Sequence, residues 1–513
     1  MSMEQICILI AIIVYLAGML YVGFYSNKKG SGKSAGDFYL GGRKLGPLVT
    51  AMSAEASDMS SWLLMGLPGV AYLSGIADAG WTAIGLAIGT YLNWLIVSKR
   101  LYRYSVKTES ITIPDFFSHR YRDKKNVLAC IAALVILIFF IPYTASGFKA
   151  IGTLFNTLFG VDYHVAMIIG AAVVVGYTVM GGFLAVSTTD LIQSIVMTIA
   201  LVVIVFFGIS YAGGFGAVAE NAKGLSGYLS LTQIHNAADN TASPYGFLNI
   251  ASMLAWGLGY FGMPHILLRF MAIRDEKELK VSRRIGSVWV VIAMSVAILI
   301  GVVGNAVTAA GNLSVLEGSS EAETVIIRLA EIISTNGVLL ALLAGVIMAG
   351  ILACTMSTAD SQLLAAASSV SQNLLQDFLK IKMTTRTAMR IARLTVLGIA
   401  VVGIGLAWNP DSSVFKIVSF AWAGFGAAFG PVMLFALFWK RSNKWGALAG
   451  MVAGGIMVFV WKFLIRPMGG LWDIYELLPA FLVASAAILV VSFVTAPPSE
   501  EIVREFESVN KSA

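Results

Sequence analysis

The stretch SAEASDMSSWLLMGLPG, residues 53–69, combines an apolar run with two carboxylates and helix-breaking residues. Glu55 and Asp58 stand three positions apart, and a Gly-Leu-Pro-Gly sequence follows them. An ionised carboxylate far from water costs at least a few kcal/mol in a spanning helix, so it normally faces a polar cavity and has a function there. The stretch therefore predicts an interrupted, functional segment inside a membrane helix.

The composition supports a membrane protein along the whole chain. Hydrophobic residues make up 58% of the 513 residues and charged residues 12%, whereas soluble domains carry about 25% charged residues. Apolar runs of about 18 to 25 residues recur, and each can cross the bilayer as a helix. We therefore predict an all-α polytopic membrane protein with about thirteen spans. These spans lie near residues 5–25, 48–68, 75–97, 127–148, 163–182, 188–211, 246–265, 285–310, 335–370, 392–408, 412–438, 446–465 and 474–496.

Lysine and arginine gather in alternate loops, as they do in short cytoplasmic loops. They follow the first, third, seventh, ninth and eleventh spans, within 28–44 (including Lys33), 99–125, 269–284 (starting at Arg269), 380–393 and 440–444. This pattern predicts an inner (plasma) membrane protein with its N-terminus outside and its C-terminus in the cytoplasm. The net charge of +7 is then a topology signal, with no nucleic-acid partner implied.

A second apolar segment also contains helix breakers: SMLAWGLGYFGMPHILLRF, residues 252–270. Its GLGYFG matches a dinucleotide fingerprint, but no strand precedes it, so we reject that function. Close helix packing through small residues is the ordinary alternative. Five segments separate the starts of the two interrupted runs, as expected for two inverted repeats of five helices whose broken first helices form a midplane site.

Hydroxyl-bearing residues in the ninth span suggest a cation site. In GILACTMSTADSQLL, residues 350–364, Cys354, Ser357 and Thr358 stand at i, i+3 and i+4, so they share one helix face. The alternative is that the hydroxyls only bond back to their own helix and bend it. Asp190 and Asp360 are further acids within apolar segments, where a structural role competes with a functional one.

Six motifs carry a resemblance to a known family. They are DFYLGGRKLG (37–46), SDMSSWLLMGLPG (57–69), GGFLAVSTTD (181–190), WGLGYFGMPHIL (256–267), MSTADSQLL (356–364) and FAWAGFGAAFGPV (420–432). Together they resemble the sodium/solute symporter family, and within it the bacterial proline branch, over nearly the full length. The resemblance implies a thirteen-helix, LeuT-like fold in a single membrane-embedded domain. Its parts are a first helix and loop (1–47), a first repeat on helices 2–6 (48–211), a second repeat on helices 7–11 (246–438), two last helices (439–496) and a cytoplasmic tail (497–513).

The resemblance also implies a site. Sodium would be held by the carbonyls of Ala56, Met59 and Cys354 and the hydroxyls of Ser357 and Thr358. Asp58 and Asp190 would be the acids that couple ion and solute. The substrate pocket would contain Tyr143, Trp256, Tyr260 and Pro264. Aromatic walls suit the ring and ammonium of proline, although an ordinary aromatic packing stripe is the alternative for Trp256 and Tyr260.

The implied function is secondary active transport: Na⁺-coupled uptake of L-proline through the lipid bilayer, without chemistry on the substrate and without an obligatory protein partner. Two departures bear on selectivity, because Ser61 stands where proline symporters commonly have glycine and Glu55 is an additional acid. Uptake of another amino acid, pantothenate or a sugar, or coupling to H⁺, remains an alternative. A channel and a membrane-bound enzyme or sensor are the rivals from other classes; the four histidines, His119, His164, His235 and His265, are too dispersed to indicate an enzyme site.

Overall fold

The computed structural model describes residues 1–30, 35–180 and 182–510, so Lys33 and the last three residues of the predicted tail lie outside the described residues. The helices are α1 (Met3–Gly30), α2 (Ala35–Leu40), α3 (Pro47–Asp58), α4 (Leu67–Ser74), α5 (Ile76–Leu92), α6 (Ser98–Lys107), α7 (Ile113–Arg120), α8 (Val127–Phe159), α9 (Tyr163–Met180), α10 (Phe183–Tyr211), α11 (Phe215–Gly224), α12 (Phe247–Leu254), α13 (Pro264–Ala272), α14 (Leu279–Ala309), α15 (Gly318–Ala322), α16 (Val325–Ser334), α17 (Val338–Ser368), α18 (Thr385–Leu406), α19 (Val414–Phe438), α20 (Lys444–Val460), α21 (Leu477–Val494) and α22 (Glu500–Asn510). Short 3₁₀- or π-helical segments are η1 (Gly41–Arg43), η2 (Trp62–Gly66), η3 (Asn93–Val97), η4 (Ala255–Gly262), η5 (Glu276–Glu278), η6 (Ser369–Phe378), η7 (Trp461–Ile465), η8 (Arg466–Met468) and η9 (Gly470–Trp472). Two strands, β1 (Gln233–Asn236) and β2 (Thr241–Pro244), pair antiparallel.

The helical, membrane-spanning character predicted from composition is confirmed, but the count of thirteen spans is not. Among the described residues, ten helices are long and apolar enough to cross a membrane, or eleven if the bent pair 247–262 and 264–272 is one span. The shorter apolar helix Tyr163–Val179 lies where the fifth span is predicted, whereas the helix Trp62–Ser74 overlaps only the end of the predicted second span. That these two segments cross the membrane stays a prediction.

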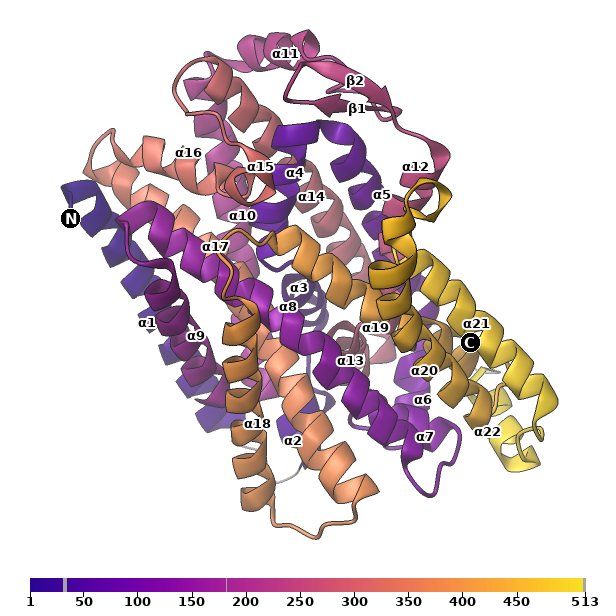
Figure 1. Cartoon of the computed structure of the whole chain (residues 1–513). Coiled ribbons are helices and arrows are strands. Elements are labelled where there is room, and N and C mark those ends of the chain that lie inside the picture. The colour runs from indigo at the N-terminus through magenta and orange to yellow at the C-terminus, as the bar shows by residue number, and fades with distance from the viewer. Residues whose placement is uncertain (31–34, 181, 511–513) are drawn as a thin grey trace.

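The molecule has two distinct ends (Figure 1). The hairpin end carries β1, β2 and α11, and the opposite α7 end carries α2, α7 and the loop before α18. The basic loops meet at the α7 end: the Arg43 guanidinium donates to the carbonyl oxygens of Ser105 (3.0 Å) and Ser110 (2.9 Å), and Arg103 pairs with Glu276 at 2.6 Å. The structure therefore brings together loops that the charge pattern assigns to one side.

The first interrupted helix follows from its own backbone bonding. Pro47 begins α3, where its missing N–H is not needed. The helix ends at Asp58 because the Ser60 N–H donates to the Asp58 carbonyl (2.8 Å) instead of continuing the ladder to Ala56. The chain then turns into η2 and α4. The predicted interruption of this segment is present.

The second interruption lies between α12 and α13. The glycine-rich η4 continues α12, Met263 is extended (φ −79°, ψ 108°) and Pro264 starts α13, with a bend of 47°. A Cβ at Gly259 would collide with the Trp422 indole of α19. Glycine is therefore needed here for the close approach of η4 to α19.

Candidate functional site

The residues of the predicted cation site lie where α3 ends beside α17. Because Ser60 does not bond to it, the Ala56 carbonyl oxygen is free to accept the Ser357 hydroxyl of α17 at 2.7 Å. The same hydroxyl lies 3.2 Å from the Cys354 carbonyl oxygen. Next to it, the Thr358 hydroxyl is buried and has no hydrogen-bond partner among the described residues. Three predicted ligands are thus in direct contact, with a fourth, unpaired oxygen adjacent in sequence.

Met59 and Asp58 occupy the end of α3. Met59 is its C-terminal cap, and its N–H donates to the Glu55 carbonyl (2.8 Å). The Asp58 side chain is fully buried and accepts the Tyr260 hydroxyl at 2.5 Å, while its Oδ1 has no partner within the part of the chain that the structure describes. Its backbone carbonyl accepts the Tyr143 hydroxyl (3.2 Å) and the Trp62 indole N–H (3.2 Å). Asp58 therefore joins the predicted ion site to the predicted substrate pocket.

Aromatic rings surround Trp256, which is 1% exposed. Its ring centroid lies 6.1 Å from Trp62, 5.1 Å from Phe415 and 6.3 Å from Trp422. The Trp422 indole also donates to the Trp256 carbonyl (2.8 Å) and stands edge-on to Tyr260 (5.2 Å). Trp256 and Tyr260 therefore belong to one aromatic cluster drawn from η2, η4 and α19.

A cavity of about 500 Å³ extends from this cluster to the hairpin end. Trp256, Phe415 and Tyr475 line it together with residues of α12, β1 and the loop after α20. Trp62 is 1% exposed and is not part of the lining. Trp256 therefore contacts both the cavity and Trp62, which follows the break in α3.

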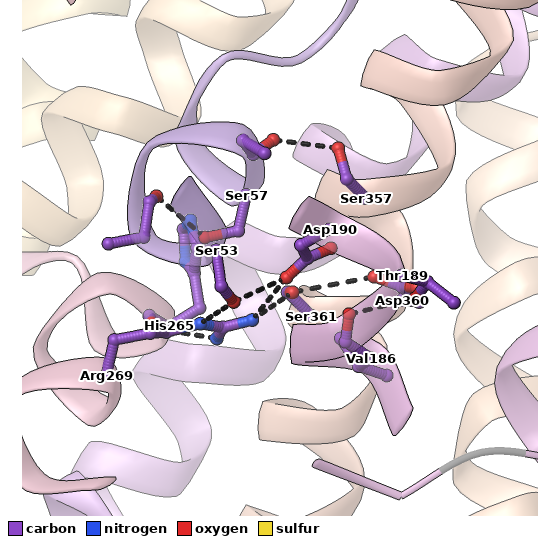
Figure 2. A network of polar contacts seen from close by, with 12 residues as sticks. Ser53, Ser57, Val186, Thr189, Asp190, His265, Arg269, Ser357, Asp360 and Ser361 are labelled. Carbon is purple, nitrogen blue, oxygen red and sulfur yellow. Dashed lines mark hydrogen bonds and ion pairs between the residues drawn. The ribbon is translucent and has the colours of Figure 1, made fainter. Parts of the chain in front are cut away.

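Asp190 lies in a separate buried network, one helical turn along α3 and α17 from Ala56 and Ser357 (Figure 2). Its Oδ2 accepts the Ser53 hydroxyl (2.6 Å) and forms an ion pair with Arg269 Nη2 at 3.1 Å. Arg269 also donates to the Ser361 hydroxyl (2.6 Å) and to Ser53 (3.0 Å). Ser361 and the neighbouring Asp360 attach the network to α17.

Arg269 corrects one sequence-based expectation. The charge pattern places it at the start of a cytoplasmic loop, but it lies within α13 at 1% exposure and is paired to Asp190. A buried guanidinium needs a carboxylate and hydroxyl acceptors, and α10, α3 and α17 provide them. The Arg269 guanidinium also donates to the His265 carbonyl, one turn earlier in α13 (2.8 Å).

Glu55 and Ser61, the two departures from the family pattern, lie in different surroundings. Glu55 Oε1 accepts the Trp94 indole N–H (2.8 Å) and the Thr90 hydroxyl (3.3 Å), so its side chain faces α5 and η3 and not Ser357 on α17. Ser61 is fully buried. Within residues 1–30, 35–180 and 182–510, neither Glu55 Oε2 nor the Ser61 hydroxyl has a hydrogen-bond partner.

Pro264, the remaining predicted pocket residue, is buried at the start of α13. The sequence did not single out Trp62, Trp422, Ser53 or Tyr475. Trp62 and Trp422 lie inside motifs that carry the resemblance, so their position was a usable signal. Tyr475 lies outside those motifs.

Comparison with known proteins identifies the family. The model of the sodium:solute symporter family matches residues 38–454. The osmoregulated proline transporter OpuE of Bacillus subtilis is 40% identical over 100% of this chain and 99% of its own length. A sodium/proline symporter of Haemophilus influenzae is 41% identical, covering 98% of each chain.

Solved structures agree on the fold. A Na⁺-coupled sialic acid symporter in a substrate-bound outward-open state superposes with a TM-score of 0.77 at 18% identity, over 96% of this chain and 99% of its own. The nucleobase-cation-symport-1 transporter Mhp1 gives 0.55 at 16% identity, over 92% and 98%. These likenesses confirm the predicted LeuT-like fold class. The chain therefore belongs to the sodium:solute symporter family, a family of transporters and not of enzymes, as its sequence predicts.

Proposed function

We propose that this protein couples the inward movement of Na⁺ to the uptake of L-proline. The observation that carries the proposal is the meeting of Ala56, Cys354 and Ser357 at the end of α3, with Asp58 joining them to Tyr143 and Tyr260. The names of relatives about 40% identical support Na⁺ and proline as the transported species.

The ion site comprises the carbonyls of Ala56, Met59 and Cys354 and the hydroxyls of Ser357 and Thr358. Na⁺ is a small, hard cation that prefers oxygen ligands, as Mg²⁺ and Ca²⁺ do. The Thr358 hydroxyl, unpaired among the described residues, and the Ser357 hydroxyl, held between two carbonyls, fit that preference. With Na⁺ bound, the Ser357 and Thr358 hydroxyls would each turn a lone pair to the ion, and the ion would hold α3 and α17 together in place of the bond from Ser357 to the Ala56 carbonyl.

The substrate pocket lies between Tyr143, Trp256, Tyr260 and Pro264. Trp256 and Tyr260 supply aromatic faces for the pyrrolidine ring and the secondary ammonium group. The N–H groups where α13 begins, after the extended Met263, suit a carboxylate. Asp58 contacts two of these aromatic residues and follows the Ala56 carbonyl by two positions, so occupancy of either site affects the other.

The topology forms part of the proposal. The hairpin end faces the outside and the α7 end, where the basic loops meet, faces the cytoplasm of a cell enclosed by the inner membrane. The repeats occupy 48–211 and 246–438, so that α3–η2–α4 and α12–η4–α13 are their equivalent broken helices. Asp190 and Arg269 then lie on the cytoplasmic side of the ion site, along the exit path of Na⁺.

Uptake of labelled L-proline into proteoliposomes tests this function. An inward Na⁺ gradient should drive accumulation, and an inward K⁺ gradient of the same size should not. A pH gradient alone driving uptake would instead favour H⁺ coupling, for which Glu55 is the candidate because one of its buried oxygens lacks a partner among the described residues. Saturable uptake of another small solute, with none of proline, would contradict the proposed substrate.

A further inference from the structure

Tyr475 lies beyond residues 38–454, which the family model covers, and outside both proposed repeats. Its ring nevertheless stacks on Trp256, with centroids 5.3 Å apart and planes inclined by 20°. Tyr475, Trp256 and Phe415 all line the cavity at the hairpin end. A residue from the last part of the chain thus contacts the proposed substrate pocket.

Tyr475 is held from two sides. Its hydroxyl donates to the Ser419 carbonyl of α19 at 2.6 Å, and its N–H donates to the Ser252 hydroxyl of α12 at 3.1 Å. It is 2% exposed. The residue therefore connects α12, which continues into η4 with Trp256, to α19, which carries Trp422.

The loop that carries Tyr475 is itself fixed. The Trp461 indole donates to the Ile474 carbonyl (3.0 Å). The neighbouring Glu476 carboxylate is fully buried and pairs with Lys462 (3.2 Å) and Arg466 (3.0 Å). A buried carboxylate paired with two cations is costly to displace, so the ring of Tyr475 has a defined position.

We infer that Tyr475 is a positioning residue of the transport site: with Trp256 and Phe415 it forms an aromatic lid between the outer cavity and the break in α3. The contacts support this layer, because Trp256 meets Tyr475, which lines the cavity, and Trp62 (6.1 Å), which does not. Trp62 in turn donates to the Asp58 carbonyl. This inference rests on the proposed function for its choice of substrate.

The lid predicts an effect on substrate selection. Tyr475→Ala leaves a space beside Trp256, so the pocket holds proline less tightly and accepts a larger ring. We expect about a tenfold loss of apparent proline affinity, and about a tenfold rise in uptake of L-pipecolate, the six-membered-ring homologue, relative to L-proline, since one methylene is discriminated by about 10–200-fold in an apolar pocket. The Na⁺ concentration for half-maximal uptake at saturating proline should stay unchanged. Tyr475→Phe loses only the bond to Ser419, so it should keep the wild-type ratio of L-pipecolate uptake to L-proline uptake.

Trp472→Ala is the matched control. Trp472 lies three residues away on the same loop, is 48% exposed and does not line the cavity. Trp472→Ala should leave the ratio of L-pipecolate uptake to L-proline uptake unchanged. The same uptake ratio is measured for Tyr475→Leu, which also removes the aromatic ring. This variant provides the test if the alanine variant does not fold.

A second readout needs no substrate. Ser60, in the break after α3, is replaced by cysteine in a chain whose Cys7, Cys130 and Cys354 have been replaced. A membrane-impermeant maleimide added outside should label the new thiol faster with Tyr475→Ala or Tyr475→Leu than with Tyr475→Phe or Trp472→Ala. The proposed lid would be contradicted if a folded Tyr475→Ala or Tyr475→Leu variant kept both the wild-type substrate ratio and the wild-type labelling rate. Absence of proline uptake by the wild type, with faster labelling in Tyr475→Ala, would contradict only the proposed substrate.

Discussion

At the residue scale, the helix break decides which oxygen atoms are available at the proposed ion site. The Ser60 N–H turns back to Asp58, and this leaves the Ala56 carbonyl for a partner from another helix. Ser357 occupies that position, and Thr358 carries a second buried hydroxyl. The break in α3 thus frees the Ala56 carbonyl oxygen, and α17 places the Ser357 hydroxyl against it.

Removing either hydroxyl should weaken Na⁺ binding first. Ser357→Ala or Thr358→Ala deletes one of about five proposed ligands, a loss of about 1–3 kcal/mol, or about tenfold to a hundredfold in Na⁺ affinity. Coupling between sites is reciprocal. These variants should therefore bind proline poorly at low Na⁺ and recover much of that affinity at saturating Na⁺, as measured by equilibrium proline binding across a Na⁺ titration.

Trp256→Ala is the contrast for this experiment, because it removes the pocket wall and should not recover at high Na⁺. Should Ser357→Ala and Thr358→Ala both keep the wild-type Na⁺ dependence, the two hydroxyls are only helix-bonded and the proposed ion site is misplaced.

The sequence could indicate contacts within one helix but not those between distant segments. The i, i+3, i+4 spacing of Cys354, Ser357 and Thr358 is enough to place them on one helix face. The pairing of Arg269 with Asp190 joins residues 79 positions apart, so neither the charge pattern nor the helical period could reveal it. The same holds for Tyr475, whose importance depends on a contact across more than two hundred positions.

At the scale of elements, η4 presents its aromatic residues because small residues let it approach its neighbours. Gly257 packs against Gly85 and Gly89 of α5, and Gly259 packs against Trp422 of α19. From the sequence, close packing through glycine is the alternative to a functional interruption. The structure has close packing and an interruption in the same segment, since the glycines that allow close contact also belong to the 3₁₀ stretch.

Gly85→Ala should destabilise this contact. The added Cβ would lie 2.6 Å from the Leu254 carbonyl oxygen and 2.8 Å from its Cα, both backbone atoms directly before η4. Overpacking of this kind costs about 1–3 kcal/mol. We expect a lower melting temperature in detergent and a weaker apparent proline affinity, because η4 must shift.

Gly176→Ala, in α9, is the control for the change in helix propensity, since its Cβ would meet nothing within 4 Å among the described residues. An equal melting temperature for the wild type and Gly85→Ala would show that α5 and η4 can separate without cost.

At the scale of the whole molecule, elements outside the proposed repeats complete each end. The loop between α20 and α21 closes over Trp256 toward the hairpin end. At the other end, α22 lies against α6 and the turn after α7, with Arg122 paired to Glu501 (2.5 Å) and Glu505 (2.9 Å). Hydropathy predicts the long apolar helices between these ends, although not their number, whereas the hairpin and α22 are short, polar elements whose place depends on tertiary contacts.

The attachment of α22 should depend on salt. Its acidic residues face basic ones, and Lys440 pairs with Glu507 at 3.7 Å. Such partly exposed pairs contribute about 0.2–1 kcal/mol each and are screened as the Debye length falls from about 8 Å at 0.15 M to about 3 Å at 1 M. Hydrogen exchange of the α22 amides should therefore be slow at low KCl and at least several-fold faster at 1 M KCl.

Charge variants of α22 test the same ion pairs. Glu501→Gln combined with Glu505→Gln should give the fast exchange already at low KCl. Arg504→Gln is the control and should not, because its side chain is 80% exposed and pairs with Glu500 within α22. If the hydrogen-exchange rate of α22 changes neither with KCl nor in the charge variants, the ion pairs do not hold α22. Its attachment then depends on the burial of Phe506 and Val509 (7% and 5% exposed).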